Sequence, residues 1–186
     1  MRRLVSLVLI SAATLLGLPP VSGVAQSGTE SYLLVITLPN KAEAANGDRV
    51  SVTGMGTFTV NPKGVTGLGG AFTHTDSAGN PIGTGTWTAT ELLSFQPYGC
   101  GIITYPDPDV ILPSNFCGGA VKLRVLLESS LGTFDAILTV FCIVGEKAPE
   151  SHDEPAEEGV TLNVADVINF NKVVAGGANI YIRTSP

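Results

Sequence analysis

The chain has 186 residues and a net charge of −6, with 16 acidic and 10 basic side chains. An acidic balance without a cluster of Lys and Arg argues against nucleic acid and anionic membrane surfaces as partners. Only 14% of the residues are charged and 22 are glycine, which is typical of a sheet protein with many tight turns and not of a helical bundle or a disordered chain.

Residues 1–25 have the organisation of a cleaved secretory signal peptide. Arg2 and Arg3 precede an apolar run over residues 4–18, which is short for a membrane span, and small residues stand before Gln26. We therefore expect a secreted protein, extracellular or periplasmic, with no membrane span after signal removal. An uncleaved membrane anchor is the alternative.

Residues 26–186 are expected to form a single all-β domain, beginning with a strand over 31–38. Pro39-Asn40 is predicted to end that strand, and one helical turn is predicted over 41–45. The next predicted strands are 49–53 and 55–60 (or one bent strand), 68–75, and 82–95 after a hairpin loop at 76–81.

A pattern of glycine, any residue, glycine, any residue, aromatic residue and threonine recurs in this part of the chain. It occupies residues 54–59 and 83–88, with a degenerate copy at 69–73. Threonine and aromatic residues favour a half-buried pleated surface, and glycines inside strands mark bends or close backbone approach. The repeats therefore predict neighbouring strands of an antiparallel meander.

The three cysteines of the chain lie in its second half. Cys100 and Cys117 sit among glycines at the two ends of a proline-rich loop, so we predict a disulfide that ties a loop near 98–120. Cys142 is in phase with the apolar residues of a predicted strand over 133–144 and is expected to be a buried thiol. The two other cysteine pairings remain open.

The rest of the chain completes the predicted sheet. Residues 121–128 alternate between apolar and polar, and an acidic linker near 146–159 precedes the last strands, predicted at 160–164, 167–174 and 179–183. Eight to ten strands with short early connections predict a single antiparallel β-barrel with an up-and-down meander. A β-sandwich is the alternative.

The segment Gly85-Thr86-Trp87 matches the Gly-x-Trp motif of lipocalin-like barrels. In that family the motif lies on the first strand, whereas three strands are predicted to precede it here. We therefore transfer no function from this resemblance.

Few residues are candidates for chemistry. His74 and Asp76 are in phase with Phe72 and are read either as a polar pair at a cavity mouth or as a strand end with Asp76 capping a turn. Glu91 is a buried acid if its strand is regular, or an exposed residue if the strand bends. The acidic surroundings of His152, and the pair Asp107 and Asp109, are interpreted as solvated loops, so no metal or cofactor is predicted.

The sequence favours a secreted, non-enzymatic barrel that binds a small apolar ligand. Phe58, Phe72 and Trp87 would line the interior and His74 would be the polar contact, unless the aromatic residues simply fill the core. An extracellular protein-interaction domain that uses the Cys100–Cys117 loop is the first alternative, with an exposed apolar patch at Ile102, Ile103 and Tyr105. A barrel-type isomerase or cyclase that uses His74, Asp76 or Glu91 is the second.

Overall fold

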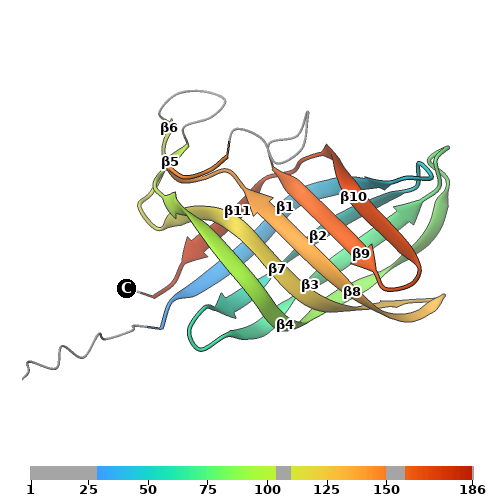
Figure 1. The fold of residues 1–186 in the computed structure, drawn as a ribbon, viewed down its shortest axis with the longest axis horizontal. Helices are drawn as coiled ribbons and strands as arrows, with labels where there is room; N and C mark the ends of the chain where they lie inside the picture. Colours follow the sequence, from blue (N-terminus) through green and yellow to red (C-terminus); the bar gives the residue numbers. More distant parts are fainter. Residues whose placement is uncertain (1–28, 104–109, 150–157, 186) are drawn as a thin grey trace, which may run out of the picture.

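The computed structural model describes residues 29–103, 110–149 and 158–185 and contains no helix in these ranges (Figure 1). The predicted signal peptide lies outside the described residues. In chain order the strands are β1 (Ser31–Ala44), β2 (Arg49–Thr59), β3 (Gly64–Thr75), β4 (Pro81–Cys100), β5 (Ile102–Ile103), β6 (Val110–Ile111), β7 (Phe116–Ser129), β8 (Gly132–Cys142), β9 (Gly159–Val164), β10 (Ile168–Ala175) and β11 (Asn179–Arg183).

Eight strands form a closed antiparallel ring. Each of β1, β2, β3, β4, β7, β8, β9 and β10 pairs with the next, and β10 pairs with β1 to close the sheet. The short strands β5 and β6 pair only with each other, within the connection from β4 to β7. The all-β meander predicted from the sequence is therefore confirmed, and the ring gives it the form of a barrel.

The closing seam of the barrel is shared by two strands. The first half of β1 pairs with β11, and its second half, from Lys41, pairs with β10. The register shifts between Ile36 and Asn40, where Pro39 has no N–H to donate to a partner strand. β10 and β11 both run antiparallel to β1, so they follow one another along the same side of one long strand.

Two buried asparagines hold this change of partner together. Asn40 donates through Nδ2 to Oδ1 of Asn179 at 2.8 Å, and its own Oδ1 accepts from the backbone N–H of Gly177 at 2.9 Å. Asn179 also donates to the carbonyl oxygens of Phe141 and Gly159. Because buried amides are costly unless they are hydrogen-bonded, this network favours one arrangement of the seam.

The predicted helical turn over 41–45 is wrong. Residues up to Ala44 continue β1, with Ala42 opposite Val50 of β2 and Val173 of β10. Asn40, Ala42 and Ala44 are buried on the inner face, as the period of a strand requires. Pairing on both sides has outweighed the helical propensity of a Lys-Ala-Glu-Ala segment.

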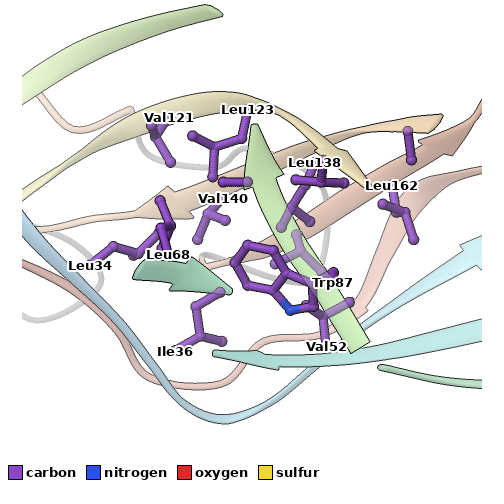
Figure 2. Close-up of a cluster of buried hydrophobic side chains, with 14 of the residues drawn as sticks. Leu34, Ile36, Val52, Leu68, Trp87, Val121, Leu123, Leu138, Val140 and Leu162 are labelled. Atoms are coloured by element: carbon purple, nitrogen blue, oxygen red, sulfur yellow. The ribbon is translucent and has the colours of Figure 1, made fainter. Parts of the chain in front are cut away.

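The recurring glycine pattern makes room for aromatic side chains from other strands of the sheet. A Cβ atom on Gly54 of β2 would collide with the indole of Trp87 on β4, and Trp87 donates from Nε1 to the carbonyl oxygen of Thr53 at 2.9 Å. The glycines Gly54 and Gly70 share a register, so the indole crosses a strip without side chains to reach β2. Trp87 lies on the fourth strand, as predicted, and packs among side chains from facing strands (Figure 2).

The predicted disulfide between Cys100 and Cys117 is present, and it links directly opposed residues of β4 and β7. Cys142 is a free, fully buried thiol on the inner face of β8. Burial in an apolar core raises the pKa of this thiol well above its ordinary value. A neutral buried thiol is unreactive, which is the behaviour expected of a structural cysteine.

Candidate functional site

The two ends of the barrel are packed differently. At one end, four inward-facing aromatic rings on β1, β2, β4 and β11 contact one another, with centroid distances from 4.9 to 5.8 Å. We call this the aromatic end; its rings are those of Tyr32, Phe58, Phe95 and Tyr181. The hydroxyl of Tyr181 donates to the carbonyl oxygen of Val140 at 2.8 Å, so the one polar group of this buried ring has a hydrogen-bond partner.

The opposite end, here called the hairpin end, holds the turns β1–β2, β3–β4, β7–β8 and β9–β10, which lie together on the right of Figure 1. Inside it is a cavity of about 160 Å³. Its walls come from seven strands and two of the turns, and they are almost entirely apolar. The lining residues are Val50, Phe72, His74, Ile82, Gly83, Leu127, Ser129, Leu131, Phe134, Leu162, Val164, Val167, Ile168 and Phe170.

Small residues on β4 explain why this end is hollow. Gly83 and Gly85 have the same strand phase as the buried Trp87, so they occupy inner positions without filling them. Phe72 lies over Gly85, where an added Cβ atom would approach its ring to 2.9 Å. Beyond Phe72, Gly83 forms part of the cavity wall. The barrel therefore tapers from filled to open along a single strand.

The mouth of the cavity has an apolar rim. Leu131 in the β7–β8 turn and Val167 in the β9–β10 turn are each 62% exposed, and Ile82 at the start of β4 is 43% exposed. Large aliphatic side chains at hairpin turns are not needed for the core. Together they present an apolar approach to the interior.

His74 is a polar residue in the otherwise almost entirely apolar cavity wall. Its Nε2 lies 3.2 Å from Oδ2 of Asp48, in the β1–β2 turn. Its ring meets the ring of Phe170 edge to face, with the centroids 5.2 Å apart and an interplanar angle of 85°. Both side chains of the His74–Asp48 pair are mostly shielded from solvent. The imidazole is thus held from two sides.

Of the two readings of Asp76, the structure supports the turn cap and not the polar pair with His74. Asp76 accepts hydrogen bonds from the backbone N–H groups of Ala78 and Asn80 and from the side chain of Asn80, so it caps the β3–β4 turn. The bonds from Asn80 hold the pKa of its carboxyl below the ordinary value. The turn-capping interpretation of Asp76 is the correct one.

Asp48 was missed because its approach to His74 depends on strand register. Val50 lies opposite His74 in the pairing of β2 with β3, which brings the residue two positions before Val50 to the same end of the sheet. The sequence signal is the Asn46-Gly47-Asp48 turn at the start of β2. That signal becomes informative only once β2 and β3 are known to be neighbours in this register.

The predicted ligand-binding residues separate into two groups. Phe72 and His74 line the cavity, together with Phe134 and Phe170, which belong to no sequence motif. Phe58 is fully buried at the aromatic end, and Trp87 is held in the core by its contacts with β2. The signal for Phe134 and Phe170 was their strand phase in the second half of the chain.

Glu91, a candidate acid for an enzyme, lies on the outside of the barrel. The register of β4 and β7 shifts between Ala89 and Glu91, which turns the side chain outward. There it pairs with Arg124, at 3.1 Å from Oε2 to Nε, and both side chains are exposed. The bent-strand alternative for Glu91 is therefore correct.

Residues 29–103, 110–149 and 158–185 hold no group of three or more His, Cys, Asp or Glu side chains arranged to bind a metal ion. Asp107, Asp109, Tyr105 and His152 lie outside the described residues. In the same part of the chain, no helix has the length and apolar character needed to span a bilayer. No protein-family model, curated protein or solved structure matches this chain.

Proposed function

We propose that this protein is an exported binding protein that holds a small, largely apolar molecule in the cavity at the hairpin end. The observation that carries the proposal is an apolar hollow of about 160 Å³ that opens at a rim of exposed aliphatic side chains. An apolar protein cavity of about 150 Å³ stays dry and binds benzene. The occupant is therefore about the size of one aromatic ring.

The packing of the rest of the barrel supports this assignment. The aromatic end is filled by large side chains that satisfy their polar groups, which shows that this chain can close its interior where closure is needed. At the hairpin end, Gly83 leaves space open, and an added methyl group there would contact only the end of the Leu131 side chain, at 3.3 Å. An unfilled apolar cavity costs stability, so a ligand that fills it would be bound favourably.

Binding of toluene tests the proposal. A ligand that binds only the folded protein raises the melting temperature by mass action, and we expect saturating toluene to raise it by a few degrees. Ile168→Trp places an indole at the half-buried cavity wall and should abolish the shift. Thr88→Trp adds the same side chain on the exposed outer face of β4 and should leave the shift unchanged.

The shift of the melting temperature with toluene can also contradict the proposal. If toluene produces no shift in the native protein, or the same shift in Ile168→Trp, then the cavity is not a binding site. Native mass spectrometry of the exported protein complements the test, because a retained small molecule would support the cavity directly.

A second candidate function is protein interaction through the disulfide-tied connection between β4 and β7. Its support is the exposure of two aliphatic residues of β6, Val110 at 44% and Ile111 at 75%. This role predicts that Ile111→Ser abolishes a complex with an extracellular partner and leaves toluene binding intact. The enzyme alternative loses two of its three proposed groups, because Asp76 caps a turn and Glu91 faces outward.

A further inference from the structure

The cavity wall has few polar side chains, and this restricts which ligands it can bind. Among the lining residues, only His74 and Ser129 have polar side chains. The hydroxyl of Ser129 is used within its own turn, because Oγ accepts from the backbone N–H of Leu131 at 3.2 Å and donates to the carbonyl oxygen of Gly132 at 3.4 Å. This leaves His74 as the side chain available to a polar group of a ligand.

Asp48 decides which ring nitrogen of His74 is available. A carboxylate can only accept hydrogen bonds, so Nε2 of His74 carries the proton and donates to Oδ2 of Asp48. In the neutral imidazole the other nitrogen, Nδ1, then has a lone pair and acts as an acceptor. Within the described part of the chain, no hydrogen bond is made by Nδ1 of His74.

We propose that the ligand of this cavity carries one hydroxyl group that donates a hydrogen bond to Nδ1 of His74. This inference rests on the proposed binding function and narrows it to apolar alcohols or phenols of one-ring size. The apolar body fills the cavity, and the hydroxyl satisfies a nitrogen that an entirely apolar ligand would leave without a partner. Asp48 and Phe170 are positioning residues. They orient the imidazole of His74 and do not themselves bond to the hydroxyl of the ligand.

Phenol and toluene form the probe pair, because they have nearly the same shape and differ in one hydroxyl. Their hydration differs, so a single pair of dissociation constants does not isolate the contact with His74. The informative quantity is the ratio of the toluene constant to the phenol constant, compared between the native protein and His74→Phe. Hydration of the free ligands cancels in this comparison.

We expect the ratio to fall by about threefold to tenfold in His74→Phe at mildly alkaline pH, which corresponds to one hydrogen bond. Thr88→Val removes a hydroxyl from the exposed outer face of β4 and should leave the ratio unchanged. An unchanged ratio in His74→Phe, with toluene still bound, overturns this inference and leaves the binding function intact. Loss of toluene binding from the native protein overturns the binding function itself.

Asp48→Asn tests the role of the carboxylate. The amide can either accept from Nε2–H or donate to Nε2, so the ring proton is no longer fixed on Nε2 and Nδ1 is an acceptor in only part of the molecules. We expect toluene to bind as before while the preference for phenol decreases, a separation that a purely structural role of Asp48 would not produce. Unchanged discrimination in Asp48→Asn overturns the assigned role of Asp48.

Two measurements on the native protein keep the inference testable if a variant fails to fold. The nitrogen NMR resonance of Nδ1 of His74 should shift when phenol binds and stay in place when toluene binds. Benzaldehyde has a similar size and carries an acceptor in place of a donor, so it should gain nothing from His74. Tighter binding of benzaldehyde than its apolar body explains would show that Nδ1 donates, and would overturn the proposal.

Discussion

The aromatic end and the hairpin end of this barrel share the strands β2 and β4 but differ in how their interiors are packed. At the aromatic end, rings from four strands meet and the Tyr181 hydroxyl reaches a carbonyl oxygen across the interior. At the hairpin end, inner positions of β4 are glycines, and the walls enclose a cavity. The difference shows that closure of the barrel does not require a filled interior along its whole length.

The interactions that link distant parts of the chain are spread unevenly along the barrel. The disulfide and the β1–β11 half of the seam lie toward the aromatic end, and the Asn40–Asn179 network lies where β1 changes partner. The β1–β10 half of the seam runs along the hairpin end, where Phe170 of β10 forms part of the cavity wall.

The largest difference between the ends should appear on truncation of an aromatic ring. Phe58→Ala removes a fully buried ring of the aromatic end and should lower the free energy of unfolding by about 3–5 kcal/mol. Phe72→Ala removes a half-buried ring at the cavity and should lower it by about 1–2 kcal/mol. Urea unfolding of both variants measures the comparison, and equal losses would contradict the division between the ends.

A methyl group added at glycine should discriminate next most strongly. Gly54→Ala forces Trp87 away from Thr53 and should destabilise the protein by about 2–3 kcal/mol, because the added Cβ would collide with the indole and lie 2.5 Å from the carbonyl oxygen of Gly69. Gly83→Ala adds the same group at the cavity wall and should change stability by less than about 1 kcal/mol. A large loss in Gly83→Ala would show that the hairpin end is more tightly packed than its cavity indicates.

Alkaline pH should lower the free energy of unfolding, because Cys142 and Tyr181 are buried in their neutral forms. Burial raises the pKa of the Cys142 thiol and of the Tyr181 phenol, so both stay neutral in the folded protein while the unfolded chain ionises. Their stabilisation is complete below the unfolded values, about 8.5 for the thiol and about 10 for the phenol, and is lost as pH rises above them.

The measurement is the free energy of unfolding as a function of pH. Between about pH 8.5 and 10, the thiol alone should reduce it by up to about 1.4 kcal/mol per pH unit. Cys142→Ala should flatten the curve in that window and retain the later decrease due to tyrosine. A curve with the same slope in both proteins would contradict the assignment to the thiol.

The smallest effect on stability is expected at the rim of the cavity. Leu131→Ser and Val167→Ser replace exposed side chains and should change the free energy of unfolding by less than about 0.5 kcal/mol. Both should nevertheless weaken toluene binding, since each removes apolar wall. Thr88→Ser on the outer face serves as the control for both quantities.

Alternation and turn chemistry within the chain determined most of the strands and the meander order, and the glycine–aromatic repeats marked β2, β3 and β4 as neighbours. The pairing of Cys100 with Cys117 was also predictable, because glycines and prolines isolate both residues at the ends of one loop. These features depend on residues close together in the sequence, so they can be predicted without knowledge of the rest of the fold. The position of Phe72 and His74 on an inner face followed from the same periodicity.

Tertiary structure alone decided the features that depend on register and on partners distant in sequence. The segment over 41–45 became a strand because β2 and β10 flank it, and Asp48 rather than Asp76 reached His74 because β2 and β3 pair in one particular register. Phe58 and Trp87 joined the core while Phe72 came to line a cavity, although all three share one sequence pattern. The physical reason is that the space around a side chain is set by residues on other strands, and a one-dimensional pattern records the face of a side chain but not what lies opposite it.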